Sequence, residues 1–259
     1  MAAPAPRTVF ISGASSGIGA ALARHYAGLG ATLGLAARGA AQLQTLADSL
    51  STEVCIYALD VSDSAALTAA ARDFSARHGV PDIIIANAGV SAGTRAELAA
   101  DIPVLSRIMQ INVIGLAATL QPFVAPMRER GSGTLVGIAS VAGFRGLAGA
   151  GAYSASKSAA ITWLESLRLE LHGSGVSVVT ICPGFVATPL TAVNRNPMPF
   201  LLQAPEAAQR IARAIAAKRR LAIIPWQMGL VFFFLRRMPN RLYDRLFARA
   251  PRKPRAPAA

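Results

Sequence analysis

Short apolar runs alternate along the chain with longer segments whose apolar residues recur at helical spacing. Runs of four to eight apolar, often β-branched residues bounded by polar or glycine positions are typical of buried strands. Seven strands are predicted, at residues 8–12, 31–37, 53–59, 82–86, 134–139, 176–182 and 221–224. Helical segments lie between them, and no internal repeat is found. This order predicts an α/β fold, a doubly wound domain with a seven-stranded parallel sheet flanked by helices, over residues 1–224.

A tyrosine and a lysine stand four positions apart at the start of one helical segment. On a helix, Tyr153 and Lys157 therefore lie on one face. A nearby ammonium lowers the pKa of a phenol, so the pair can serve as a general acid and base. Taken alone, the same spacing also fits a solvated or half-buried pair without function.

A glycine-rich turn follows the first predicted strand and opens a helix. Strand, glycine turn and helix N-terminus form an arrangement that binds a pyrophosphate, because glycines allow close approach and the N-terminal N–H groups attract anions. The spacing is G-x-x-x-G-x-G, and the alternative is a turn that binds no nucleotide. The candidate cofactor-binding residues of this turn are Gly13, Ser15, Ser16, Gly17, Ile18 and Gly19.

Arg38 follows the second predicted strand, where a dinucleotide fold meets the adenosine ribose. An acidic residue there accepts from the 2′-hydroxyl, whereas an arginine can pair with a 2′-phosphate. Residues 36–39 contain no Asp or Glu, so NADP(H) is favoured over NAD(H). The alternative for Arg38 is an exposed loop charge. Asp60 and Val61, after the third strand, are expected near the adenine.

Further polar residues follow later strands or interrupt apolar helices. Asn87-Ala88-Gly89 follows the fourth strand, Asn112 lies in an apolar helix expected over residues 103–127, and Ser140 follows the fifth strand. The Asn-x-Gly turn can simply end a strand, and Asn112 can be a structural amide. Ser140 can reach the site of Tyr153, because ligands bind outside the carboxyl ends of strands in such sheets. Residues 190–200, after the sixth strand, have the length of a lid.

Together these residues resemble the classical short-chain dehydrogenase/reductase family over roughly residues 7–224. The resemblance implies a Rossmann-type fold, with Tyr153 as general acid in carbonyl reduction. It implies that Lys157 lowers the pKa of Tyr153 and holds the nicotinamide ribose, that Ser140 donates to the substrate carbonyl, and that Asn112 holds a proton-relaying water. The nicotinamide side would be lined by Pro183, Gly184, Val186 and Thr188. One departure is that Ser15 or Ser16 stands where NADP-preferring members often carry a second basic residue.

The resemblance implies an NAD(P)-dependent oxidoreductase that interconverts a ketone and a secondary alcohol. We expect an NADPH-dependent reductase of a hydrophobic or lipid-like carbonyl compound, acting as a homodimer or homotetramer. The alternative from another class is a non-catalytic NADP-binding sensor of the same fold, although a sensor has no need of the Asn112, Ser140, Tyr153 and Lys157 set.

Composition and charge narrow the possible partners and the expected compartment. The chain carries 26 Lys and Arg against 13 Asp and Glu, a net charge of +13 that is densest after Leu235. Such an excess can reflect nucleic acid, a membrane surface, an anionic cofactor or a compositional habit. No nucleic-acid module accompanies it, so no nucleic-acid partner is expected. Cys55 and Cys182 are expected to be free and buried, no metal-ligand spacing occurs, and the N-terminus lacks a signal peptide, so the cytoplasm is expected.

Residues 225–259 form an extension that the family resemblance does not cover. The apolar run from Trp226 to Leu235 is shorter than the ~20 residues that span a bilayer, and arginines follow it. Two interpretations stay open: peripheral association with the inner face of a membrane, or packing on a partner subunit or over the substrate pocket. Helical spacing continues through Leu242 and Phe247, and residues 251–259 are expected to be disordered.

Overall fold

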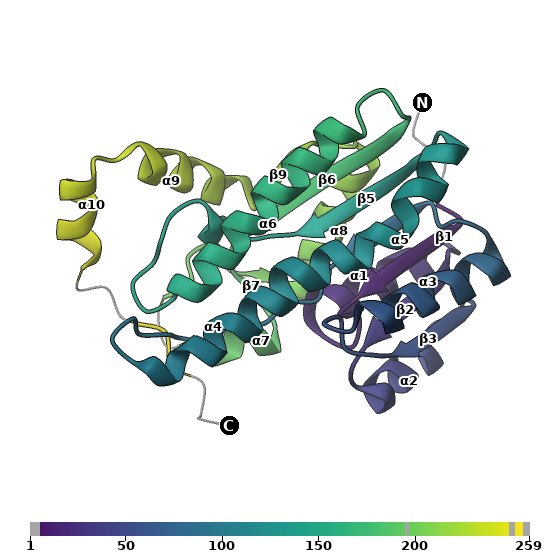
Figure 1. Ribbon diagram of the computed structural model, residues 1–259, viewed down its shortest axis with the longest axis horizontal. Coiled ribbons are helices and arrows are strands. Elements are labelled where there is room, and N and C mark those ends of the chain that lie inside the picture. Colours follow the sequence, from purple (N-terminus) through teal and green to yellow (C-terminus); the bar gives the residue numbers. More distant parts are fainter. Residues whose placement is uncertain (1–5, 195–196, 249–251, 256–259) are drawn as a thin grey trace.

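A parallel sheet of seven strands forms the centre of the molecule (Figure 1). The computed structural model describes residues 6–194, 197–248 and 252–255. The sheet order is β3-β2-β1-β4-β5-β6-β9, and all its pairings are parallel. The strands are β1 (Thr8–Ser12), β2 (Thr32–Ala37), β3 (Val54–Ala58), β4 (Ile83–Ala86), β5 (Gly133–Ile138), β6 (Val176–Pro183) and β9 (Leu221–Ile224). The predicted seven-stranded doubly wound fold is confirmed.

Helices cover both faces of the sheet. The bounds are α1 (Gly17–Ala27), α2 (Ala40–Asp48), α3 (Ser64–His78), α4 (Ile102–Met109), α5 (Gly115–Arg130), α6 (Gly151–Glu170), α7 (Pro189–Ala192), α8 (Ala204–Ala216), α9 (Trp226–Arg237) and α10 (Asn240–Phe247). One core cluster joins the sheet to α1, α2 and α8 through Leu22, Leu43 and Ile211. A second joins the opposite face to α3, α5 and α6, with Phe74 and Leu164 among its members.

Strand β4 shows why the apolar runs form buried strands. Successive side chains of a strand point to opposite faces. Ile83 and Ile85 accordingly join the α1/α8 cluster, while Ile84 joins the α3/α5/α6 cluster. A strand with helices on both faces needs apolar residues at every position, which is the pattern of parallel sheets.

The helix expected over residues 103–127 extends further than predicted and contains a π-turn. A 3₁₀ turn, η1 (Ala99–Asp101), leads into α4, and the π-helical turn η2 (Gln110–Ile114) joins α4 to α5. The continuous helix from residue 99 to 130 is long and apolar enough to cross a membrane by length and composition. However, its residues Leu116, Leu120 and Phe123 belong to the core cluster on the sheet, so we interpret it as a core helix.

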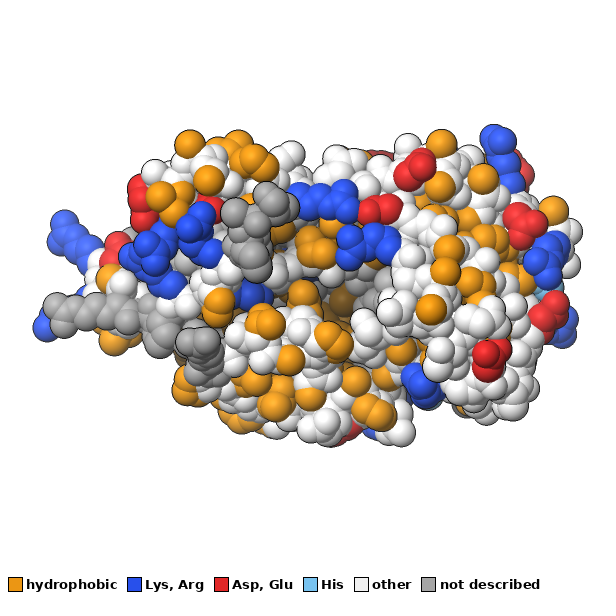
Figure 2. All heavy atoms as spheres, turned by 90° about the horizontal axis from the view of Figure 1, so that it is seen from below, with side chains coloured by type: hydrophobic (Ala, Val, Ile, Leu, Met, Phe, Trp, Pro, Cys, Tyr) orange, Lys and Arg blue, Asp and Glu red, His pale blue; other side chains and the backbone are white. Residues whose placement is uncertain are grey.

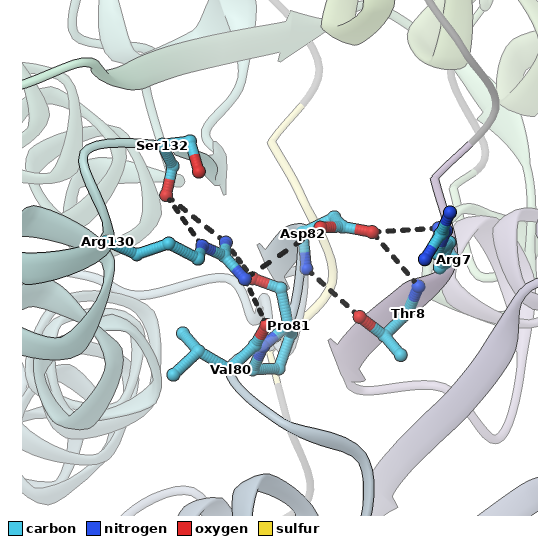
Figure 3. A network of polar contacts seen from close by, with 7 residues as sticks. All are labelled: Arg7, Thr8, Val80, Pro81, Asp82, Arg130 and Ser132. Carbon is cyan, nitrogen blue, oxygen red and sulfur yellow. Dashed lines mark hydrogen bonds and ion pairs between the residues drawn. The ribbon is translucent and has the colours of Figure 1, made fainter.

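Asp82 and Arg130 join several elements at the amino ends of the strands (Figure 3). The Asp82 carboxylate accepts from the backbone N–H of Arg7 at 2.8 Å and of Thr8 at 3.3 Å. The Arg130 guanidinium donates to the carbonyl oxygens of Val80, Pro81 and Ser132, and lies 3.8 Å from the Asp82 carboxylate. The starts of β1, β4 and β5 are thereby fixed to the end of α5.

The extension packs on the domain and returns to it. Met228 and Phe232 of α9 are buried against Ala139, Val141 and Cys182. Arg145 donates to the carbonyl oxygens of Leu235 (2.8 Å) and Met238 (3.0 Å) at the end of α9. The expectation of disorder at residues 251–259 is wrong for 252–255, because tertiary contacts order this segment: Gly93 N–H donates to the Pro254 carbonyl at 2.9 Å. Residues 251 and 256–259 lie outside the described residues.

Two small elements frame the expected lid at residues 190–200. Strands β7 (Val186–Ala187) and β8 (Leu202–Gln203) pair in parallel on either side of it, and α7 starts it. The sequence did not predict this two-stranded sheet. Residues 195 and 196 of the lid lie outside the described residues. The two cysteines, Cys55 and Cys182, are free and buried, as expected.

Candidate functional site

A crevice of about 470 Å³ opens at the carboxyl ends of the central strands. Strand β1 lies between β2 and β4, so the sheet order reverses direction here, and such a point is where open α/β sheets bind ligands. Nearly all the predicted site residues line this crevice. They are Gly13, Ser15, Ser16, Gly17, Ile18, Arg38, Asp60, Val61, Asn87, Ala88, Gly89, Ser140, Tyr153, Lys157, Pro183, Gly184, Val186 and Thr188.

Two glycines of the turn between β1 and α1 leave no room for a larger side chain at their positions. Gly13 has a φ of +65°, and a Cβ there would lie 2.6 Å from the Ala88 Cα. Gly19 does not line the crevice. A Cβ on Gly19 would lie 2.2 Å from the Gly13 carbonyl oxygen, so this glycine allows α1 to pack against the turn. Asn87 completes the turn by donating to the carbonyl oxygens of Ser12 (3.2 Å) and Gly13 (3.0 Å).

The N-terminus of α1 faces the crevice through Gly17 and Ile18. Its N-cap residue, Ser16, makes no side-chain capping bond. The first backbone N–H groups of a helix need partners, and their partial positive charge suits a pyrophosphate. These residues therefore fit the phosphates of a dinucleotide.

Two charged residues, Arg38 and Asp60, lie at the adenosine end of the crevice. Arg38 is exposed at the end of β2, and Gly39 and Gln42, which the sequence analysis missed, line the crevice beside it. Asp60 accepts from the Ser62 N–H and hydroxyl, and its ion pair with Arg107 measures 2.6 Å. Partial burial acts to raise the pKa of Asp60, but these bonds outweigh it and lower the pKa to about 2. Asp60 is therefore ionised and paired within the protein.

Tyr153, Lys157 and Ser140 meet at the other end of the crevice, where β5 ends and α6 begins. The buried Lys157 ammonium donates to the Ile138 carbonyl at 2.9 Å and lies 5.8 Å from the centroid of the Tyr153 ring. The Ser140 hydroxyl accepts from the Ala142 N–H at 3.2 Å, which holds the side chain at the start of the 3₁₀ turn η3 (Val141–Gly143).

The expectation that Lys157 lowers the pKa of Tyr153 is wrong for this arrangement. Burial raises the pKa of Tyr153, and the Ser140 hydroxyl acts in the opposite direction without cancelling it. Burial also lowers the pKa of Lys157 to about 8. The physical reason is that both groups lose solvation, and desolvation disfavours the charged form of each. The neutral phenol is a proton donor at neutral pH.

Asn112 lies behind the crevice, in the π-turn η2. Its amide oxygen accepts from the Val90 N–H at 2.8 Å, and its amide nitrogen donates to the Val90 carbonyl and the Ser156 hydroxyl, both at 2.9 Å. Asn112 therefore ties the loop after β4 to α6. No local sequence pattern indicated Ser156 as its partner. π-Turns often occur at functional sites, and this one directs a polar amide into a buried position.

Residues after β6 close the crevice over the glycine turn. Thr188 caps α7, and its methyl group would lie 3.1 Å from a Cβ on Gly17. A Cβ on Gly184 would lie 2.8 Å from Met228 Cγ, so α9 supports this wall from outside. Leu190 and Thr191, in the expected lid, also line the crevice, and no sequence motif marked either residue.

Known proteins share this sequence and fold. The sequence profile of the short chain dehydrogenase family matches residues 7–198. The chain belongs to this family. An uncharacterized oxidoreductase of Myxococcus xanthus is 41% identical over 247 residues, covering 94% of this chain and 97% of that protein. The ketoacyl reductase HetN of a Nostoc species is 32% identical over 226 residues, covering 84% and 78%.

A solved structure covers almost the whole chain. The short chain dehydrogenase/reductase from Burkholderia phymatum in complex with NAD is 26% identical, with a TM-score of 0.82, and covers 99% of this chain and 100% of that one. Family membership makes this short-chain dehydrogenase an NAD(P)-dependent oxidoreductase that acts on carbonyl and CH–OH groups. The glycine turn and the open N-terminus of α1 fit such a cofactor on geometric grounds.

Proposed function

We propose that this enzyme reduces a ketone on a hydrophobic, lipid-like compound to a secondary alcohol, with Tyr153 as general acid. One observation carries the proposal: Tyr153, Lys157 and Ser140 line one end of a continuous crevice whose other end is the glycine turn. A nicotinamide cofactor supplies hydride when bound. The ketoacyl reductase among the relatives reduces a carbonyl by its name, which supports the direction.

The chain's own residues have separate parts in this proposal. The Tyr153 hydroxyl gives its proton to the carbonyl oxygen, and the raised pKa of the phenol keeps that proton available at neutral pH. The Ser140 hydroxyl donates to the same oxygen and stabilises the negative charge that develops there. Lys157 binds the nicotinamide ribose. Asn112, fixed to Val90 and Ser156, keeps the loop after β4 in register with α6 and holds a water that relays protons to Lys157.

We propose that the cofactor is NADPH. Arg38 at the rim of the crevice supplies a charge for a 2′-phosphate, and Ser15 and Gln42 beside it can donate hydrogen bonds. Residues 36–39 offer no carboxylate to a ribose 2′-hydroxyl, and Asp60 is engaged by Arg107. The solved relative is described with NAD, so both cofactors belong in the test.

Two associations complete the proposal. Exposed apolar residues on α4, η2 and α6 (Ile102, Leu105, Ile114 and Leu169) support a homodimer or homotetramer formed through these helices. Exposed apolar residues on α9, together with the arginines that follow, support peripheral attachment to the inner face of a membrane in the cytoplasm. The other interpretation is that the extension packs on a partner subunit or over the substrate pocket, and its contacts with its own domain support the second of these.

Tyr153→Phe tests the chemistry. We expect this variant to lose at least about a thousandfold in kcat, because the proton donor is gone, while its Kd for NADPH changes by less than about threefold. A panel of ketones of increasing chain length is offered to the wild type and the variant with NADPH and with NADH, and cofactor oxidation is followed at 340 nm.

Two results would contradict the proposal. Undiminished carbonyl reduction by Tyr153→Phe would remove Tyr153 from the mechanism. If the wild type binds NADPH yet oxidises it with no member of the panel, the alternative of a non-catalytic NADP-binding sensor gains support.

A further inference from the structure

The segment Arg252–Arg255, here called the C-terminal strap, lies beside the Tyr153 end of the crevice. It runs parallel to Gly93 through a backbone bridge at Arg255, and Gly93 N–H donates to the Pro254 carbonyl at 2.9 Å. A Cβ on Gly93 would lie 2.2 Å from the Lys253 carbonyl oxygen, and one on Gly149 would lie 2.8 Å from Arg252 Cβ. The strap therefore fits between the loop after β4 and the loop before α6.

A buried carboxylate anchors the strap. Asp101, 5% exposed, accepts from Arg255 Nη2 at 2.6 Å and from Nε at 3.2 Å. It also accepts from the Arg95 backbone N–H at 2.7 Å. The hydrogen bond from Arg255 is the main cause that lowers the pKa of Asp101. A buried carboxylate is costly without a partner, so Asp101 favours the docked position of the strap.

The ion pair between Asp101 and Arg255 holds a second cation, Lys253, next to the proposed proton donor Tyr153. Lys253 is half-buried, and its Nζ lies 5.6 Å from the centroid of the Tyr153 ring. Lys157 is 5.8 Å from the same centroid, so two lysines approach one phenol ring. Lys253 is not among the residues that line the crevice, so it approaches the Tyr153 ring from outside the part that would hold the cofactor.

The Lys253 ammonium can bind an anion in addition to its present hydrogen-bond partner. Its Nζ donates to the Ser91 hydroxyl at 2.6 Å, and within the described part of the chain no carboxylate forms an ion pair with it. An ammonium has three donors, and partial burial of its charge lowers the pKa of Lys253. An anion bound here would compensate that charge and form a charge-assisted hydrogen bond.

We infer that Lys253 is a specificity-determining residue that binds an anionic group, a carboxylate or a phosphate, a few bonds away from the carbonyl of the substrate. This inference rests on the proposed carbonyl reduction and adds the substrate class: an amphiphile with an apolar body and an anionic group near the ketone. The strap acts as a wall of the substrate site in its own chain, and Arg255 and Asp101 are positioning residues for it.

Paired substrates test the inference. The acids 2-oxo-, 4-oxo- and 5-oxodecanoate are each compared with their methyl esters, so that charge changes while chain length stays nearly constant. We expect at least one acid to be preferred to its ester by the wild type. In Lys253→Met, KM for that acid should rise at least about tenfold with little change in kcat, and the ester should change by less than about twofold.

Two further variants separate charge recognition from structure. Lys253→Arg keeps the charge and should retain most of the preference for the acid. Arg219→Met removes a charge just before β9, at the opposite end of the sheet strands from the site, and should behave as wild type. Equal effects of Lys253→Met on acid and ester, or no effect on either, would overturn the inference, because a mere tether would not distinguish them.

A binding measurement separates this inference from the proposed reduction. Calorimetric titration of decanoate and of methyl decanoate into the enzyme with NADPH does not depend on turnover. Decanoate binding that is lost in Lys253→Met supports the anion site even if no ketone is reduced, in which case only the proposed reduction fails. Decanoate binding that is absent from the wild type, or equal in both proteins, overturns the anion site whatever the ketones do.

Discussion

Tyr153 and Lys157 share the first turns of α6, and burial opposes the ionisation of both. The raised pKa of Tyr153 keeps the phenol protonated, and the lowered pKa of Lys157, about 8, brings this lysine close to losing its proton at physiological pH. Within the described residues the Lys157 ammonium has only the Ile138 carbonyl as a hydrogen-bond partner, so it carries a desolvation cost that a surface lysine does not. Keeping Lys157 charged in this buried position therefore lowers the free energy of unfolding.

Lys157→Met should remove that cost and make the protein more stable at neutral pH. The folded pKa of about 8 lies below the ordinary 10.5, so the unfolded chain holds the proton more tightly. The penalty is complete below pH 8 and disappears as pH rises from 8 to 10.5. Its upper limit is about 3 kcal/mol, against about 1 kcal/mol for the lost hydrogen bond to Ile138. Denaturant unfolding of variant and wild type at pH 7, 8, 9 and 10 measures the difference.

The expected signature is a stability advantage of Lys157→Met of about 1–2 kcal/mol at pH 7 that shrinks steadily toward pH 10. Carbonyl reduction should be lost at the same time. Lys218→Met removes an exposed lysine and should show neither effect. A variant that is less stable than the wild type at every pH, or a difference that does not change with pH, would refute the buried-charge interpretation.

At the scale of elements, the strands and long helices were predictable because each is determined by local pattern. Strand β4 supplies isoleucines to both core clusters, and a short run of β-branched residues that is apolar at every position favours a strand buried on both faces. The glycine turn was predictable for a related reason: its backbone conformation and close contacts admit little but glycine. Likewise, Tyr153 and Lys157 were found because a fixed spacing on one helix places them together.

The elements that were missed depend on distant partners. The π-turn η2 places Asn112 against Val90 and Ser156, and no local sequence pattern indicates that these residues form hydrogen bonds. Strands β7 and β8 have two residues each, too few for a period. The strap was expected to be disordered because its composition is proline-rich and basic, yet Arg255 meets an aspartate 154 positions earlier. The pKa of Tyr153 was misjudged because burial cannot be read from spacing.

Arg130 at the end of α5 should contribute to stability and not to catalysis. It donates to carbonyl oxygens at the amino edge of the sheet, whereas the crevice lies at the carboxyl edge (Figure 3). Arg130→Met should lower the unfolding free energy by about 1–2 kcal/mol, since several carbonyl groups lose a charged donor near the surface. The corresponding fall in Tm is roughly 2–4 °C per kcal/mol, and kcat should stay within about twofold.

Arg128→Met is the matched control for this prediction. Arg128 lies on the same helix, is exposed, and within the described residues its side chain makes no hydrogen bond. Thermal melts and steady-state rates of both variants are compared with the wild type. A Tm for Arg130→Met that equals that of Arg128→Met would show that the bonds at the amino edge contribute little, and a large loss of kcat would show that the two edges are coupled.

At the scale of the whole molecule, the net charge of +13 and the exposed apolar residues concentrate toward the extension. Figure 2 shows Lys and Arg side chains crowded on the left part of one face of the molecule. In Figure 1, α9 and α10 project to one side of the sheet. Trp226 is 65% and Phe234 67% exposed, while Met228 and Phe232 of the same helix are buried in the domain. Helix α9 is therefore fixed by one face and free on the other.

That geometry decides how the proposed membrane attachment should be tested. Deleting residues 226–259 would uncover the buried contacts of Met228 and Phe232, so substitutions on the free face are preferable.

In low salt, the wild type should sediment with vesicles that contain phosphatidylglycerol, and salt should weaken this because the arginine charges are screened. The double variant Trp226→Glu/Phe234→Glu should stay in the supernatant. Its matched control, Leu29→Glu/Leu221→Glu, adds the same charge at exposed apolar positions outside the extension and should sediment as the wild type does. Wild-type protein that remains in the supernatant, or a double variant that sediments undiminished, would exclude α9 as a membrane anchor and leave its free face to a second subunit.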